Sequence, residues 1–153
     1  PGQGGVLVQA AALAETPAGP AAGSPVRLHD TVSGSWLRVY GRTADADPTV
    51  VRAVLQGPAQ VVFAEVSGVA GALAIGRAVV TGPWLGLSAV EVVPAHRRRG
   101  LGRAVVDALL RWGVARQARW AYLQVAPDNV AALGLYAGYG FTTHHRYCYL
   151  RPG

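Results

Sequence analysis

Hydrophobic residues alternate with polar or small residues in several short runs along this 153-residue chain, a pattern that predicts β-strands. The runs lie at residues 4–14, 26–30, 59–67, 70–80, 84–93, 121–126 and 141–150. The three central runs, between residues 59 and 93, are separated by glycine-containing turns that are too short for crossover connections. We therefore expect these three strands to form an antiparallel meander.

Four other segments have the spacing or the capping residues of helices. They lie at residues 33–42, at 46–57, from 101 onward and at 128–140. The second begins with an aspartate cap and a proline, Asp47 and Pro48, and the third repeats apolar residues at steps of four and three. A meander followed by a β-α-β unit predicts an α/β fold in which helices cover a sheet.

The length and composition indicate a single globular domain. Apolar residues make up 51% of the chain and charged residues 14%, which is unlike a disordered protein. A Pro/Gly/Ala loop at 15–25 divides an N-terminal strand and linker, residues 1–25, from the main domain at 26–153. No apolar run reaches the length of a membrane span, so we expect no membrane partner.

Arginine supplies the whole positive charge of the chain. All 14 basic residues are arginine, and the net charge is +6. This usage in an Ala/Gly/Val-rich chain indicates a GC-rich, bacterial genome, which weakens any functional interpretation of arginine content alone. The single cysteine, Cys148, cannot form an internal disulfide and fits a reducing, cytoplasmic location.

Three consecutive arginines precede Gly100-Leu101-Gly102, between an expected strand and an expected helix. The first-turn amides of a helix lack partners and carry partial positive charge, and glycine lets oxygen atoms approach the backbone. Nearby arginines add charge-assisted hydrogen bonds, so the segment is typical of a phosphate site. The alternatives are a solvated basic helix start, an ordinary strand-helix turn and a nucleic-acid patch. We disfavour nucleic acid because the arginines cluster at one turn and its helix.

Two motifs of the chain resemble the GNAT superfamily of N-acetyltransferases. The first is a strand, Pro-x-x-Arg/Gln-x-x-Gly-x-Gly and a helix, matched by VVPAHRRRGLGRAVVDALL. The second, matched by YLQVAPDNVAALGLYAGYGF, has Asn129, Ala132, Tyr136 and Gly-Phe at the family spacing. The match covers about residues 90–141, and the closing HHRYCYL is similar to bacterial members that carry this domain at the end of a longer chain.

The resemblance implies a mixed, mainly antiparallel central sheet with helices on both faces, whose central strands splay apart to form the cleft for acetyl-CoA. In the family, the loop matched by residues 97–103 holds the pyrophosphate through backbone amides, and the strand matched by residues 90–93 pairs with the pantetheine arm. The implied cofactor-binding residues are Val90, Glu91, Val92, Val93, Arg97, Arg98, Arg99, Gly100, Leu101, Gly102, Arg103, Asn129 and Tyr136.

The resemblance also implies roles in proton transfer. Tyr136 matches the tyrosine that protonates the departing thiolate. In the ribosomal-protein acetyltransferases a glutamate occupies the position of Gln124, and glutamine cannot act as that base. Glu91 is the candidate base, with a water chain as the alternative and Glu65 as a weaker candidate. Adjacent strand residues such as His144 and His145 point to opposite faces, and we expect no metal site.

The function expected from these features is direct transfer of an acetyl group from acetyl-CoA to a primary amine of unspecified kind. The alternative is a non-catalytic acyl-CoA-binding regulatory module, which Gln124 favours, whereas Tyr136 favours the enzyme. The tryptophans at 36, 84, 112 and 120 are interpreted mainly as core residues. The alternative to a core role is that Trp36, together with Tyr40, lines the acceptor pocket, because the early helices form the wall of that pocket in the family.

Overall fold

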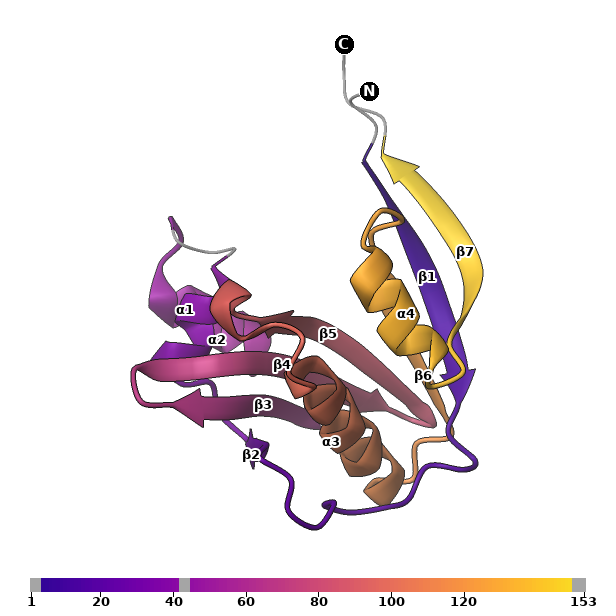
Figure 1. Cartoon of the computed structure of the whole chain (residues 1–153), viewed down its shortest axis with the longest axis horizontal. Helices are drawn as coiled ribbons and strands as arrows, with labels where there is room; N and C mark the ends of the chain where they lie inside the picture. Colours follow the sequence, from indigo (N-terminus) through magenta and orange to yellow (C-terminus); the bar gives the residue numbers. More distant parts are fainter. Residues whose placement is uncertain (1–3, 42–44, 150–153) are drawn as a thin grey trace.

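The computed structural model describes residues 4–41 and 45–149, with the side chains at 4, 148 and 149 outside the description. The side chain of the single cysteine, Cys148, therefore lies outside the described residues. Within these residues the chain forms one seven-stranded sheet in the order β2-β3-β4-β5-β6-β1-β7 (Figure 1). The strands are β1 (Gly4–Ala12), β2 (Arg27–His29), β3 (Val61–Gly68), β4 (Gly71–Thr81), β5 (Trp84–Val92), β6 (Trp120–Val125) and β7 (Thr142–Tyr149).

The helices of the described chain are α1 (Gly34–Tyr40), α2 (Pro48–Leu55), the 3-10 helix η1 (Pro94–His96), α3 (Leu101–Ala115) and α4 (Val130–Ala137). Helices α1 and α2 begin at the capping residues that the sequence predicts. Ser33 caps α1 by accepting from the Trp36 amide, and Asp47 caps α2 in the same way. Helix α4 is shorter than predicted, because it ends at Ala137 with Gly138 as its C-cap.

The sheet is mixed and mainly antiparallel, as expected. Strands β2 to β5 form an antiparallel series that contains the predicted meander, and β1 pairs antiparallel with both β6 and β7. The one parallel pair in the described chain joins β5 to β6, and its register covers Trp84–Gly86 against Trp120–Tyr122. Beyond Gly86 the two strands separate, and the sheet divides into two arms (Figure 1).

The N-terminal strand lies far from its neighbours in sequence. Strand β1 is inserted between β6 and β7, so that Ala11 faces Ala121 on one side and Ala10 faces Thr142 on the other. The loop at 15–25 then returns the chain to β2 at the opposite edge of the sheet. Residues 4–12 therefore belong to the same sheet as the main domain, and they complete the arm that carries β6.

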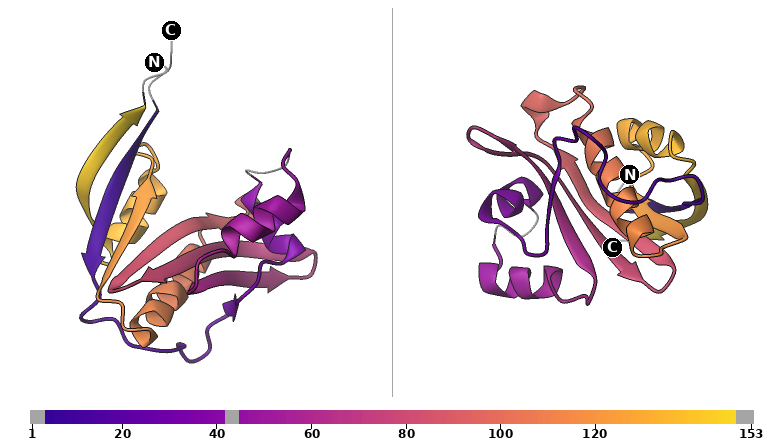
Figure 2. Two further views of the ribbon diagram at one scale, coloured as in Figure 1. Left: turned by 180° about the vertical axis from the view of Figure 1, so that it is seen from behind. Right: turned by 90° about the horizontal axis from the view of Figure 1, so that it is seen from below.

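Helices cover both faces of the sheet, as the resemblance implies. Helices α1 and α2 lie on one face and α3 and α4 on the other (Figure 2). The larger core lies on the α3 side, and a smaller core around Trp36 and Phe63 lies on the α1 side. Trp36 is 0% exposed and donates through Nε1 to the Gly76 carbonyl at 3.1 Å. The alternative that Trp36 lines an acceptor wall is therefore wrong, because its ring fills the smaller core.

Gly76 lets α3 approach β4 closely. A Cβ atom on Gly76 would lie 2.5 Å from Val105 Cγ1 and 2.9 Å from Leu109 Cδ1. Both side chains are 0% exposed, so neither can move into open space. The missing side chain of Gly76 thus sets the height of α3 above the sheet, and with it the position of the loop that precedes α3.

Replacing Gly76 with alanine is expected to lower the free energy of unfolding by about 1–3 kcal/mol, because the added methyl group overpacks a closed core. Gly134 is the matched control. It lies within α4, and a Cβ atom there would have nothing within 4 Å. Gly134→Ala should raise stability by up to about 1 kcal/mol through helix propensity. Urea unfolding of both variants checks this, and equal stabilities would contradict the seating of α3 on Gly76.

Candidate active site

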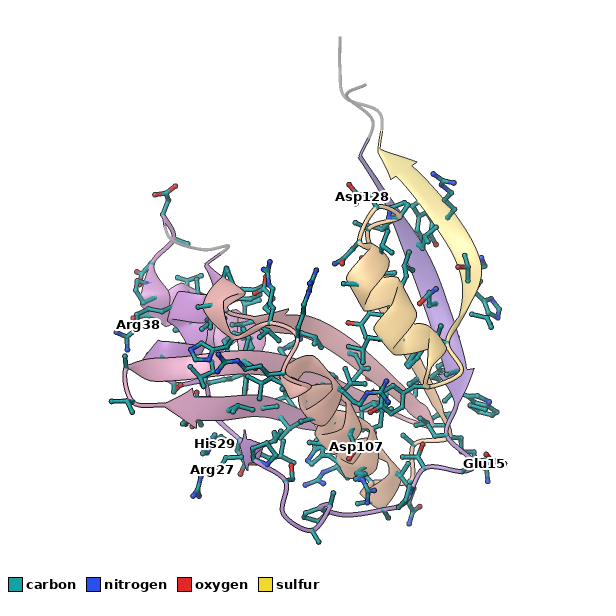
Figure 3. The ribbon with its side chains drawn as sticks, in the orientation of Figure 1. Glu15, Arg27, His29, Arg38, Asp107 and Asp128 are labelled. Carbon is teal, nitrogen blue, oxygen red and sulfur yellow. The ribbon has the colours of Figure 1, made fainter. Side chains whose placement is uncertain are left out.

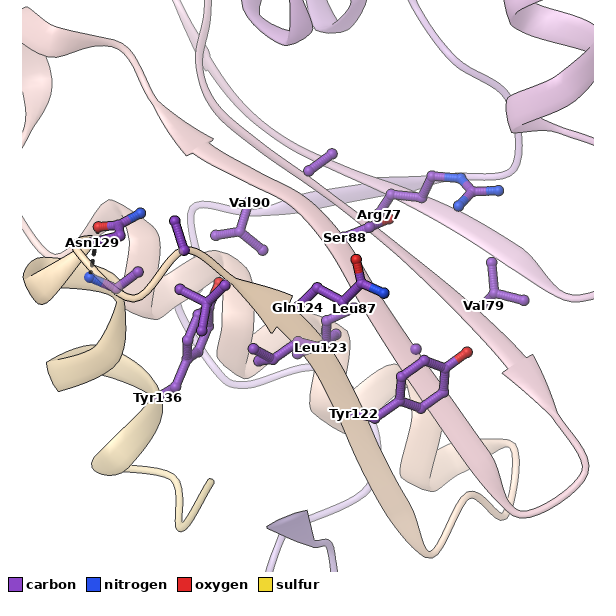
Figure 4. Close-up of a pocket in the computed structure, with 15 residues that line it drawn as sticks. Arg77, Val79, Leu87, Ser88, Val90, Tyr122, Leu123, Gln124, Asn129 and Tyr136 are labelled. Atoms are coloured by element: carbon purple, nitrogen blue, oxygen red, sulfur yellow. Dashed lines mark hydrogen bonds between the residues drawn. The ribbon is translucent and has the colours of Figure 1, made fainter. Parts of the chain in front are cut away.

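A cleft of about 440 Å³ opens where β5 and β6 separate (Figure 4). It is lined by Arg77, Val79, Gly86, Leu87, Ser88, Ala89, Val90, Tyr122, Leu123, Gln124, Val125, Ala126, Asn129, Ala132 and Tyr136. These residues come from β4, β5, β6 and α4, together with the loop that joins β6 to α4. The cleft therefore reaches from the α4 face of the sheet to the face that α1 and α2 partly cover.

A β-bulge in β5 lies along the wall of this cleft. Ile75 pairs with Glu91 and Arg77 pairs with Ser88. Between these two pairs β4 has one residue and β5 has two, so β5 contains one extra residue. Ala89, inside the bulge, has a φ of 57°, a left-handed conformation that is uncommon for a residue other than glycine. Bulges bend a strand and increase its twist. The bulge thus turns the end of β5 away from β6 and widens the cleft.

The loop before α3 has the geometry of an anion site. Gly100 is the N-cap of α3 with a φ of 76°, and its carbonyl accepts the first helical bond from Ala104 at 3.0 Å. No side chain of the described residues caps this end of the helix. The amides of Leu101, Gly102 and Arg103 therefore lie in the first turn, where helix geometry leaves them without intrahelical acceptors. Such a terminus favours a negative group.

The three arginines before Gly100 are exposed on the turn. Arg97 donates through Nε to the Val92 carbonyl at 3.3 Å, which ties the turn to the end of β5. Arg99 lies 3.4 Å from the ring of His96, and Arg98 has a φ of 65°. Val93 continues from β5 and donates its amide to the Leu73 carbonyl at 2.9 Å. The structure thus gathers the residues of the first motif at the end of β5 and the start of α3.

The second motif contributes two residues to the cleft. Asn129 is the N-cap of α4, because its Oδ1 accepts from the Ala132 amide at 3.2 Å. Tyr136 lies two turns further along α4, is 7% exposed and packs edge-on against Phe141. Burial raises the pKa of the Tyr136 hydroxyl above its ordinary value. The hydroxyl is therefore neutral, and able to donate a proton, at any physiological pH.

The two candidate bases lie outside this lining. Val90 lines the cleft, whereas Glu91 follows the bulge and faces Ile75 of β4. Glu65 is 8% exposed on β3 and accepts from Ser33 Oγ at 2.7 Å. It also accepts from the hydroxyls of Ser35 and Ser67. Glu65 thus anchors the start of α1, and the structure does not bring either glutamate together with Tyr136 in the cleft.

The sequence predicts no binding role for several lining residues, although Tyr122 and Gln124 stand within the second motif. Arg77 is an isolated arginine in an apolar strand, and Tyr122 and Gln124 alternate along β6 on the face away from α4 (Figure 4). Trp84 and Trp120 lie on the same face and are 41% and 40% exposed. The prediction that these two tryptophans belong to the core is wrong, because none of the described helices covers this part of the face. In the structure both tryptophans alternate with buried residues along their strands, a pattern that the apolar sequences of β5 and β6 do not reveal.

The described residues show neither a metal cluster nor a membrane-spanning helix. No three His, Cys, Asp or Glu side chains in residues 4–41 and 45–147 gather as a metal site would require. His144 and His145 lie with ring centroids 5.4 Å apart at the bulge of β7. None of the described helices has the length and apolar character of a membrane span.

Comparisons with known proteins agree with this geometry. Residues 3–150 match the family described as "Probable histone acetyltransferase Rv0428c C-terminal", and the chain belongs to this family. It is 34% identical over 131 residues to the probable histone acetyltransferase Rv0428c of Mycobacterium tuberculosis. The alignment covers 82% of this chain and 40% of that protein, so the chain spans about two fifths of the relative.

Solved structures show the GNAT fold. The GCN5-related N-acetyltransferase from Sphaerobacter thermophilus superposes with a TM-score of 0.67 at 19% identity, covering 97% of this chain and 51% of that one. The aminoglycoside N-acetyltransferase AAC(6')-Iy, solved with a CoA bisubstrate analogue, gives 0.64 at 15% identity, covering 84% of this chain and 98% of that one. The resemblance inferred from the two motifs is thereby confirmed, and acetyl transfer is the general chemistry of these relatives.

The buried Tyr136 hydroxyl should make stability depend on pH in the alkaline range. The unfolded chain releases the tyrosine proton near pH 10, whereas the folded chain holds it to higher pH. The contribution of the neutral Tyr136 hydroxyl to the free energy of unfolding is therefore complete below about pH 10, and it is lost as the pH rises through the folded pKa. Urea unfolding of wild type and Tyr136→Phe from pH 8 to 11 should show wild type losing stability relative to the variant above about pH 10. Parallel curves would contradict it.

Proposed function

We propose that this domain transfers an acetyl group from acetyl-CoA to a primary amine. The observation that carries the proposal is a cleft in which a neutral, buried tyrosine faces separated strands, next to a helix N-terminus that suits a phosphate group. Membership of an acetyltransferase family supports it. AAC(6')-Iy, which shares the fold, has been solved with CoA and with a bisubstrate analogue of CoA.

Each part of acetyl-CoA has a matching element in this proposal. The pyrophosphate binds the amides of residues 101–103, and Arg97, Arg98 and Arg99 add charge on the turn. The pantetheine arm extends along residues 90–93, where the separated edge of β5 offers backbone groups to an added strand. Asn129 and Ala132, at the start of α4, border the arm on its other side.

The chemistry proposed is direct attack. The amine nitrogen forms a bond to the thioester carbon, and the carbon-sulfur bond breaks with its electron pair leaving on sulfur. Tyr136 then supplies the proton that the CoA thiolate takes up, because its hydroxyl is neutral and borders the cleft. Glu91 remains the proposed base with a water chain as the alternative, since the amine must lose a proton.

Acetyl-CoA is expected to stabilise the protein, by roughly 2.7 kcal/mol at a hundredfold excess over its dissociation constant. Gly100→Val should abolish this stabilisation, because a branched side chain would stand where the phosphate approaches. Gly23→Val is the matched control, since Gly23 has a φ of 71° and, like Gly100, has open space around it. Thermal unfolding and calorimetry with acetyl-CoA check both variants. Normal binding by folded Gly100→Val would place the phosphate site elsewhere.

Tyr136→Phe is expected to lower turnover by roughly 100-fold or more, the range for loss of a general acid, with little change in acetyl-CoA affinity. Tyr139→Phe is the matched control, because the Tyr139 hydroxyl donates to the Arg103 carbonyl at 3.2 Å and does not line the cleft. The measurement is the steady-state rate per folded molecule with an accepted amine. Equal rates for wild type and Tyr136→Phe would remove Tyr136 from the mechanism.

A further inference from the structure

The side chains that line the cleft carry positive charge and no negative charge. The chain has eight carboxylates, and none of them is among the residues that line the cleft. Arg77 is the one lining residue with a formal charge. Of the carboxylates labelled in Figure 3, Glu15 lies on the loop after β1, Asp107 on α3 and Asp128 beside the start of α4. A cationic acceptor entering this cleft would therefore meet a positive charge and no carboxylate of the lining.

The Arg77 guanidinium is held rigidly at the end of the cleft. Its Nε and Nη2 atoms donate to the Leu55 carbonyl, the last residue of α2, at 3.2 and 2.8 Å. Among the described residues it forms no ion pair with a carboxylate. Burial lowers the pKa of Arg77, while Tyr40 raises it, and the guanidinium stays charged. A partly desolvated cation with remaining N–H groups favours an anion as its partner.

An aromatic cluster borders the same end of the cleft. Tyr122 lines the cleft, and the ring centroid of Trp84 lies 6.1 Å from that of Tyr122 and 5.5 Å from that of Trp120. All three rings are about two fifths exposed. Gly86 makes room for Tyr122, because a Cβ atom on Gly86 would lie 2.8 Å from the tyrosine oxygen. The cluster thus forms a preformed apolar surface next to the cleft.

The cation and the aromatic cluster face the same space. Arg77 pairs with Ser88, and Gly86, two residues earlier on β5, pairs with Tyr122, so these residues share one face of the sheet. Figure 4 shows the Arg77 guanidinium and the Tyr122 hydroxyl pointing toward the same end of the pocket, near Val79. Arg77 and Tyr122 lie two strands apart, roughly 10 Å across the sheet. Their side chains can bracket a molecule of amino-acid size.

We propose that the acceptor is a small primary amine that carries a carboxylate, bound by Arg77, and an aromatic or similarly large apolar group, bound by the cluster of Trp84, Trp120 and Tyr122. This inference rests on the proposed acetyl transfer and specifies its substrate class. Polycationic acceptors are disfavoured, because the lining offers them no carboxylate and the whole chain carries a net charge of +6.

The test compares amines that differ by one group, with acetyl-CoA as donor and product formation measured by mass spectrometry. L-Phenylalanine, L-phenylalaninamide and phenethylamine vary the carboxylate, and glycine removes the aromatic group. Spermidine, kanamycin and a lysine-rich peptide are the polycations. We expect kcat/KM for L-phenylalanine to be at least about tenfold higher than kcat/KM for every other amine in the series. This series uses the unmodified protein, so it decides the matter whether or not a variant folds.

Variants assign the effect to residues. Arg77→Gln should lower kcat/KM for L-phenylalanine by about tenfold to a hundredfold, as loss of a charge-assisted hydrogen bond does, and leave phenethylamine unchanged. Arg77→Lys keeps the charge and should retain part of the preference for L-phenylalanine over phenethylamine. Arg27→Gln removes the same charge at the exposed edge strand β2 and should change nothing (Figure 3). Trp84→Ala should raise KM for L-phenylalanine and not for glycine.

The outcomes separate the two proposals. Three results would overturn the acceptor assignment and leave the cofactor site standing. The protein could use L-phenylalanine and phenethylamine equally well, or it could prefer a polycation. It could also bind acetyl-CoA in calorimetry and turn over none of these amines. Absence of acetyl-CoA binding would overturn the proposed function, and the acceptor assignment with it.

Discussion

The structure depends on one interrupted ladder of hydrogen bonds. Strands β5 and β6 pair in parallel over Trp84–Gly86 and then separate. Paired strands bury their backbone groups against each other, so two strands that part must each be supported from the other side. Strand β5 is held by β4 along its length, and β6 is held by β1. Because each arm is complete in itself, the gap between them is a stable feature of the fold.

Local features keep the gap at a fixed width. The extra residue in β5 at Ala89 bends that strand away from β6, and the conformation of Ala89 is one that the surroundings must impose. Gly76 admits α3 close to β4 on one face, while its carbonyl accepts from Trp36 on the other. The N-terminus of α3, the bulge and the core around Trp36 are therefore fixed to the same few residues of β4 and β5, which positions the cleft relative to the loop at Gly100.

Local patterns in the sequence predicted the local parts of this fold. Caps such as Asp47, the apolar spacing of α3 and the alternation in the meander act over a few residues, and the structure has them as expected. The insertion of β1 between β6 and β7 joins residues more than a hundred positions apart, and no local pattern specifies it. Arg77 and Tyr122 come to line the same cleft from different strands, which no local pattern specifies either. Trp84 and Trp120 look like core residues in sequence because their exposure depends on which face lacks a helix.

The composition of the cleft also constrains how the amine loses its proton. A general base works best when it can reach the proton directly or through one water molecule. The lining offers Ser88, Gln124 and the neutral Tyr136, and no carboxylate, so no strong base borders the cleft directly. A neutral amine can attack without prior deprotonation, but its nitrogen becomes cationic when it bonds to the thioester carbon, and its proton must still leave through water or to Glu91. In the proposed complex the Arg77 charge pairs with the carboxylate of the acceptor, so water is left as the direct route by which the amine proton leaves the cleft.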